Sequence, residues 1–286
     1  MPEALDDAVT ARKMWRTLEP LHGMVYFAPE APEEYARLGF EEHRAGYFAT
    51  RAAPMGAVGA EVVIATFFNF HPDLVRRHIP KAWAASPPER IVDARFRLAG
   101  AALERLLGAA VDSAEMAEAA ALARAAALAC RPEGRPLYAG HASLSWPAEP
   151  HLVLWHAVTL LREHRGDGHV AVLTSENVSG CEALVMHAAT GDVPAAVLRT
   201  SRAWPDDEWR AATEGLRARG WLDAEGTLTT AGRAHRTSVE QRTDALARAP
   251  WRHIGTEACD RLRAIARPWS RAVVEAGTFA TSIWEG

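Results

Sequence analysis

The densest group of reactive side chains lies in eight consecutive residues. Residues 162–169 read Arg-Glu-His-Arg-Gly-Asp-Gly-His, which places two arginines, two carboxylates and two histidines directly after a strongly apolar segment. Charged groups are costly to bury unless they are paired or used in chemistry. The block is therefore either a tightly hydrogen-bonded corner between two helices or a functional site.

The two glycines of the block favour a break between helices. We expect a buried helix over 151–165 that ends at Gly166, and a second helix over 168–177 that is capped by Asp167. The N-terminus of the second helix would bind an anion, because its backbone N–H groups and its dipole both favour negative charge.

The side chains around this corner could serve binding or catalysis. Arg162 and Arg165 flank it and would hold the anion. His169 falls in the first turn of the second helix, where the dipole disfavours a protonated ring and leaves a neutral imidazole near pH 7. A catalytic use would pair His164 or His169 with Glu163, or with the neighbouring aspartate, as acid and base.

Three polar residues share one stripe of the expected helix over 151–165. His156, Thr159 and Glu163 recur at helical spacing on a surface that is otherwise apolar. Polar groups in such a stripe need partners. They are either core side chains that bond to neighbouring helices or the floor of a pocket.

Aromatic residues could supply the apolar walls of that pocket. Phe67 and Phe70 close an apolar run over 57–70, which we expect to form a buried helix, and His71 opens a short basic helix. Together with Trp155 they would line a ligand site. A solvated helix face is the alternative for the basic residues.

No residue pattern points to a metal, a cofactor or a nucleotide. There is no HExxH motif and no paired Cys/His spacing, and Cys130, Cys181 and Cys259 lie far apart, as expected of buried free thiols. GxGxxG, P-loop and GxSxG motifs are also lacking. We assign no metal ligand, and the cofactor is unknown.

The composition is typical of a soluble globular protein. The chain has 286 residues, of which 49% are hydrophobic and 24% charged, and its formal charge of -4 gives no general attraction to nucleic acid or anionic lipid. No stretch approaches the roughly 20 apolar residues of a membrane span. The acidic N-terminus lacks the features of a secretory signal. We expect a cytoplasmic protein without a membrane partner.

Helical periodicity runs through the whole chain. Proline-rich interruptions at 131–136 and 146–150 predict a helical domain over 1–135 and a second domain over 136–286. Further helices are predicted over 6–27, 32–38, 72–79, 90–108, 113–130, 180–189, 206–219, 230–247 and 256–275.

The order of elements in the second half is that of a winged helix. The helix over 206–219 is followed by a polar hairpin around 223–226 and then by the helix over 230–247, and the Leu-Thr-Thr-Ala-Gly turn at 228–232 resembles that of MarR-type regulators. This resemblance implies a mainly α fold, with a helical N-terminal half and a MarR-like winged-helix C-terminal half that carries a small β-hairpin wing. In that family the helix corresponding to 206–219 enters the major groove of DNA.

The charges of this stretch weaken the DNA interpretation. The expected reading helix begins with three acids at 206–208, the wing carries Asp223 and Glu225, and residues 201–250 hold eight arginines against eight acids. Through the segments 154–156 and 161–169, most of the chain also looks like an actinobacterial helix-turn-helix family. That resemblance implies an architecture and a ligand pocket.

The leading interpretation is a small-molecule-binding protein on a repurposed winged-helix scaffold. The ligand would be anionic or aromatic, with the arginines as its anchor and the Phe and Trp side chains as its walls. One alternative is a ligand-responsive DNA-binding regulator that dimerises through its terminal helices. Another is an enzyme that uses the His/Glu or His/Asp pair.

Overall fold

The computed structural model describes the backbone of residues 2–279 and the side chains of residues 8–279. Helices make up about three quarters of this part of the chain, in agreement with the mainly helical fold that the sequence predicts, and three short 3₁₀ turns join some of them. The helices are α1 (Pro2–Gly23), α2 (Ala31–Arg37), α3 (His43–Ala52), α4 (Ala60–Phe67), α5 (Pro72–His78), α6 (Lys81–Ala85), α7 (Pro88–Leu107), α8 (Ala114–Leu128), α9 (Pro136–Ala142), α10 (Pro150–Ser175), α11 (Gly180–Ala188), α12 (Ala195–Arg202), α13 (Asp206–Ala218), α14 (Thr230–Leu246) and α15 (Ala249–Glu275). None of the helices described is long and apolar enough to cross a membrane.

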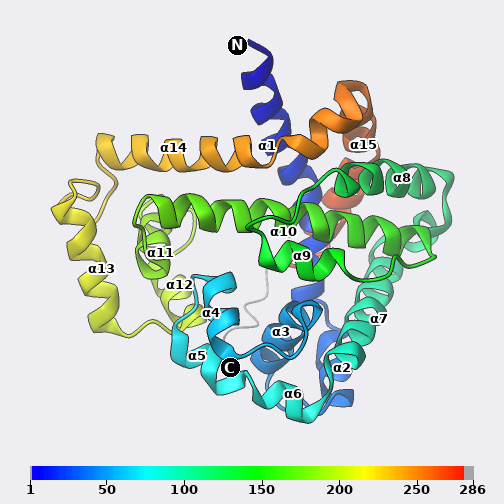
Figure 1. Cartoon of the computed structure of the whole chain (residues 1–286), viewed down its shortest axis with the longest axis horizontal. Coiled ribbons are helices and arrows are strands. Elements are labelled where there is room, and N and C mark those ends of the chain that lie inside the picture. The colour runs from blue at the N-terminus through cyan, green and yellow to red at the C-terminus, as the bar shows by residue number, and fades with distance from the viewer. Residues whose placement is uncertain (1, 280–286) are drawn as a thin grey trace.

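Helix α10 is the central element of the fold. It crosses the middle of the molecule, with α14 above it and α4, α11 and α12 below it in Figure 1, and α1 crosses it. Its first half is buried on nearly all sides against α8, α9, α7 and α1, which agrees with the apolar sequence of that half.

The predicted helix break inside the 162–169 block is wrong. Helix α10 runs without interruption for 26 residues through both glycines. A Cβ atom at Gly168 would lie 2.7 Å from Arg135 Nη1, so the missing side chain makes room for this guanidinium. Arg135 uses that space to donate hydrogen bonds to the carbonyl oxygens of His164 and Leu246. No helix begins at 168, and the predicted anion site at a helix N-terminus does not form.

Two hydrophobic cores lie along α10. The larger one combines the first half of α10 with α1, α3, α7, α8 and α15. The smaller one gathers the last turns of α10 with α11, α13 and α14, through residues such as Val172, Leu216 and Val239. The polar middle of α10 therefore lies where the two cores meet.

The predicted β-hairpin wing is also wrong, because residues 2–279 contain no strand. The loop after α13 is closed by a single isolated bridge between Leu222 and Leu228. Arg217 binds the loop through two exposed hydrogen bonds, with Nε donating to the carbonyl of Asp223 at 3.0 Å and Nη2 to that of Ala224 at 2.7 Å. Thr229 already caps α14, so no residues are left to extend the ladder.

The apolar run over 57–70 is shorter as a helix than predicted. Helix α4 ends at Phe67 because Phe68 adopts a φ of +60°, which turns the chain toward α5. Helices α3, α6, α9 and α12 lie in segments for which the sequence analysis predicted no helix. The remaining predicted helices are found, most of them with shifts of a few residues at their ends. Helix α15 begins seven residues before the predicted start at 256, and a kink at Gly255, where φ is +80°, separates the added residues from the predicted helix.

Candidate ligand cavity and helix-turn-helix unit

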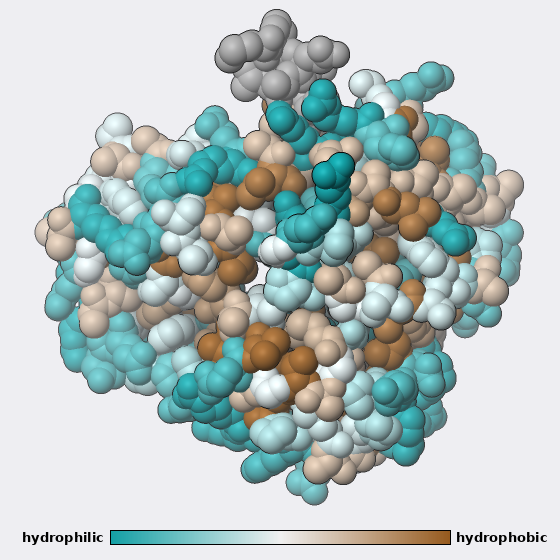
Figure 2. All heavy atoms as spheres, viewed as in Figure 1, coloured by the Kyte–Doolittle hydropathy of each residue, from teal (hydrophilic) through white to brown (hydrophobic). Residues whose placement is uncertain are grey.

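A cavity of about 450 Å³ lies against the polar middle of α10. The face drawn in Figure 2 is hollowed near its centre, between the levels of α10 and α4, with hydrophobic residues beside the hollow. The opposite walls come from α3, α4 and the loop after α4, while α11, α12 and α14 close one end. The volume lies within the range of small-molecule sites.

Helical spacing explains why α10 lines the cavity with charged groups. Arg162, Gly166, His169 and Leu173 follow one another at intervals of three or four residues and therefore share one face. The aromatic residues Tyr47, Phe67, Phe68 and Phe70 form the facing wall. One side of the cavity is thus rich in ionisable groups and the other in aromatic rings.

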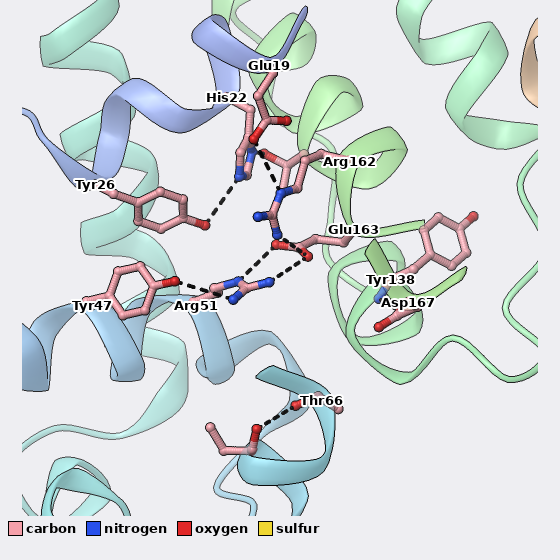
Figure 3. A network of polar contacts seen from close by, with 12 residues as sticks. Glu19, His22, Tyr26, Tyr47, Arg51, Thr66, Tyr138, Arg162, Glu163 and Asp167 are labelled. Atoms are coloured by element: carbon pink, nitrogen blue, oxygen red, sulfur yellow. Dashed lines mark hydrogen bonds and ion pairs between the residues drawn. The ribbon is translucent and has the colours of Figure 1, made fainter. Parts of the chain in front are cut away.

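Glu163 is the most deeply buried charge of this wall, with 0% exposure. Arg51 of α3 donates to both of its oxygens, through Nε at 3.2 Å and Nη2 at 3.2 Å, and Arg162 Nη1 donates at 2.8 Å (Figure 3). Burial by itself would raise the pKa of Glu163, but the two guanidinium groups outweigh it and hold that pKa well below its ordinary value. Glu163 is thus an anion with its oxygens already occupied.

A second set of buried contacts continues this network toward α1. His22 Nδ1 lies 3.1 Å from Thr159 Oγ1, and the phenol oxygen of Tyr26 lies 3.3 Å from His22 Nε2 (Figure 3). Arg95 donates to the same phenol at 3.1 Å. Burial and the nearby Arg162 keep the pKa of His22 well below its ordinary value, so this ring stays neutral.

Arg165 joins the cavity to α14 and α1. Its Nη2 atom donates to Asp244 at 3.0 Å and to Glu240 at 3.2 Å, and its guanidinium stacks 4.3 Å from the ring centroid of Trp15. Its Nε atom is buried and has no hydrogen-bond partner among the described residues. His169 reaches the same helix, with Nδ1 3.0 Å from Thr243 Oγ1, and burial lowers its pKa.

The charges that line the cavity do not cancel. Its walls include five arginines and three carboxylates. Asp167 is a lining carboxylate without an ion pair among the described residues; it accepts the backbone N–H of Tyr138 at 2.9 Å, and burial raises its pKa to about 6. Arg202 adds a guanidinium 4.7 Å from the ring centroid of Phe70. The excess of cations and the aromatic wall together suit an anionic ligand with an apolar body.

The structure brings about half of the predicted site residues together. Six of them line the cavity: Phe67, Phe70, Arg162, Glu163, Arg165 and His169. The two predicted catalytic histidines are not paired with the carboxylates expected for them, since no hydrogen bond joins His164 or His169 to Glu163 or Asp167 in the part of the chain described. His164 packs edge-on against Tyr138, and burial lowers its pKa to about 3.

The other predicted residues lie elsewhere. His156 and Trp155 face α7, where the ring of Phe96 packs against both. Thr159 points to α1. His71 caps α5 and places Nε2 3.1 Å from Glu208 Oε1 on α13. The polar stripe predicted on α10 is therefore divided among several neighbours.

Several residues of the cavity were not anticipated from the sequence, above all Arg51 and Tyr47. Both lie on α3, one helical turn apart, and the phenol oxygen of Tyr47 accepts a hydrogen bond from Arg51 Nη1 at 3.4 Å. The available signal was one arginine inside the apolar run Phe48-Ala-Thr-Arg-Ala-Ala-Pro54, since a buried arginine requires an acidic partner. The part of the chain that the structure describes holds no cluster of three or more potential metal ligands.

Helices α11, α12 and α13 form a compact three-helix unit at one end of α10, at the left of Figure 1. Ser179 and Glu182 form a capping box that starts α11, and Arg219 Nη2 lies 3.3 Å from Glu182 Oε1. The acids that open α13 are partly neutralised, since Arg199 pairs with Asp206, and His71 contacts Glu208. The exposed face of α13 then carries Asp207, Arg210 and Glu214.

The comparison with protein families agrees with this arrangement. A model described as a helix-turn-helix family matches residues 11–280, which is nearly the whole chain. No curated protein and no solved structure matches it. The match covers both hydrophobic cores and the cavity between them, and the chain belongs to this helix-turn-helix family.

Proposed function

We propose that this protein is a ligand-responsive DNA-binding regulator. Its ligand is a small molecule with an anionic group and an apolar or aromatic body, bound in the cavity beside α10. The observation that carries the proposal is that the helix-turn-helix unit itself forms part of the cavity wall, through Leu184, His187 and Arg202. A ligand that fills the cavity therefore contacts the unit that would bind DNA.

The chemistry of the walls supports this ligand class. Glu163 and Glu240 are held by arginines, whereas Asp167 is protonated over part of the physiological range, so the lining is cationic overall. Guanidinium groups bind carboxylate and phosphate through paired hydrogen bonds. The phenyl rings opposite offer contact area for an apolar body.

Ligand binding is tested by native mass spectrometry of the purified protein, followed by titration with benzoate, salicylate and indole-3-acetate monitored by calorimetry. Arg236→Gln removes a lining cation at the rim, and Phe67→Ala removes part of the aromatic wall. Arg90→Gln, an exposed residue of α7 outside the cavity, is the matched control. We expect weaker binding for the first two variants and unchanged binding for the third. Equal affinity of all three variants for these ligands would show that the cavity is not the ligand site.

DNA binding is the part that the family match supports. Within the three-helix unit we assign α13 as the reading helix, because its outward face is exposed, with Arg210 and Glu214 facing the bases. The test is a mobility-shift assay with DNA from upstream of the protein's own gene, at low salt and with a scrambled duplex for comparison. Arg210→Ala should abolish the preference for the upstream fragment. No preference in the unaltered protein would exclude sequence-specific regulation.

A further inference from the structure

A second feature, separate from the cavity beside α10, is a basic groove between α1 and α15. The groove has a volume of about 450 Å³, and no acidic residue lines it among those whose side chains the structure describes. Its cations are Lys13, Arg16, Arg263, Arg267 and Arg271. We call this surface the terminal groove.

The cations of the terminal groove are mostly unpaired. Lys13, Arg16, Arg267 and Arg271 are exposed and make no ion pair with any residue that the structure describes. Arg263 has only a long contact of 3.4 Å with the exposed Asp260. Glu19, the nearest acid on α1 beyond the groove, faces Arg162 of α10 instead. This concentration of free positive charge is unusual in a chain with a formal charge of -4.

The spacing of these cations is regular and the walls are held in place. Residues 263, 267 and 271 stand at i, i+4 and i+8 on α15, which sets them about 6 Å apart in a row along one helix face. Lys13 and Arg16 form the opposite wall on α1. The two helices pack along their length, and Ser270 Oγ donates to the carbonyl of Thr17 at 2.5 Å. A fixed row of cations suits a polymer with regularly repeated anions.

We infer that the terminal groove binds the sugar–phosphate backbone of duplex DNA. This inference rests on the proposed DNA binding. It assigns most of the electrostatic contribution to DNA affinity to the terminal groove and not to α13. The exposed face of α13 carries no excess of positive charge, so it supplies few contacts of the kind that release counterions from DNA. The terminal groove supplies up to five. The two helices that form it, α1 and α15, lie apart from α13 in Figure 1.

Two other occupants fit the groove less well. A second copy of the chain placed symmetrically on it would bring the same cations against one another, which is unfavourable. A membrane surface favours cations flanked by large apolar side chains that insert into lipid, whereas Val274 is the only large aliphatic residue in the lining among the side chains described. Phosphate groups of a nucleic acid require only the cations.

The experiment measures binding of the full-length protein to a labelled random-sequence duplex by fluorescence anisotropy, over about 50 to 200 mM salt. The test variant is Arg267→Gln/Arg271→Gln. The matched control is Arg90→Gln/Arg131→Gln, which removes two exposed arginines elsewhere. We expect the test variant to bind about 10- to 100-fold more weakly at 0.1 M salt and to lose about 2 from the slope of log K against log salt. Arg267→Lys/Arg271→Lys should retain most of the binding.

Three outcomes overturn the inference: equal binding and slope in the test and control variants, no duplex binding by the unaltered protein at low salt, or binding to vesicles rich in anionic lipid in place of the duplex. The proposed function is tested by separate measurements. Arg210→Ala can leave the random-sequence affinity intact while the preference for upstream DNA is tested. Ligand titration of the cavity does not involve the terminal groove.

Discussion

Arg51 on α3 and Glu163 on α10 form a two-pronged ion pair, with both nitrogen–oxygen distances at 3.2 Å and side-chain exposures of 9% and 1%. The pair spans 112 positions of sequence and connects the aromatic wall of the cavity to its charged wall. Because Arg162 shares the same carboxylate, one acid neutralises two guanidinium groups.

Removing that acid should destabilise the protein strongly. Glu163→Gln leaves Arg51 and Arg162 with reduced compensation in a buried site, and we expect a loss of about 3–5 kcal/mol in the free energy of unfolding, measured with urea. Glu33→Gln breaks the exposed pair with Arg37 and should cost less than about 1 kcal/mol. A similar cost for both variants would mean that the buried pair is not held as described.

Asp167 should make stability fall as the pH rises. Its folded pKa of about 6 lies above the value of 3.8 for an unfolded chain, so the folded state holds the proton more tightly. This stabilisation is complete below about pH 4 and is lost as the pH rises through 6, with an upper limit of about 3 kcal/mol. Asp167→Asn keeps an acceptor for the N–H of Tyr138 and removes the titration.

The measurement compares the unfolding free energies of this variant and the unaltered protein at several pH values. Relative to the unaltered protein, the variant should gain stability between pH 4 and 7. The buried histidines act in the opposite direction, because their lowered pKa values cost stability as the pH falls, and they contribute equally to both proteins. Parallel pH curves would contradict the assignment to Asp167.

The two glycines inside α10 should respond oppositely to alanine. Gly168→Ala places a methyl group 2.7 Å from Arg135 Nη1 and should displace the hydrogen bonds to His164 and Leu246, at a cost of about 1–3 kcal/mol. Gly166→Ala meets only atoms at 3.6 Å or beyond and should stabilise the helix by up to about 1 kcal/mol. Thermal unfolding of the two variants distinguishes these signs. Equal shifts would mean that Arg135 does not occupy the space beside Gly168.

Gly180 should be required for docking of the three-helix unit formed by α11, α12 and α13. A Cβ atom there would lie 2.0 Å from the carbonyl oxygen of Phe68, which is backbone and cannot move aside cheaply. We expect Gly180→Ala to cost about 2–3 kcal/mol and to raise amide exchange in α11. Gly59→Ala, with no atom within 4 Å, is the control and should change stability by less than about 1 kcal/mol. Unaltered exchange in α11 would contradict the contact.

Local sequence was sufficient for the helices and for part of the site. Apolar periodicity predicted the mainly α fold, because it depends on neighbours within a few turns. The winged-helix order predicted for the second half was wrong at the wing, where one isolated bridge replaces the hairpin, whereas the predicted helix-turn-helix family is confirmed over residues 11–280. The block at 162–169 was recognised by composition, and Arg162, Glu163, Arg165 and His169 do line one cavity.

Tertiary packing decided what those residues face. Local propensity places a break at Gly166, yet contacts from Arg135 and from α14 keep α10 continuous, since packing outweighs the small cost of glycine in a helix. Glu163 pairs with Arg51, which is more than a hundred residues away in the sequence, and no local pattern predicts this contact. His164 packs against Tyr138 and His169 contacts Thr243, so these two histidines lie on different sides of α10 although they are close in sequence.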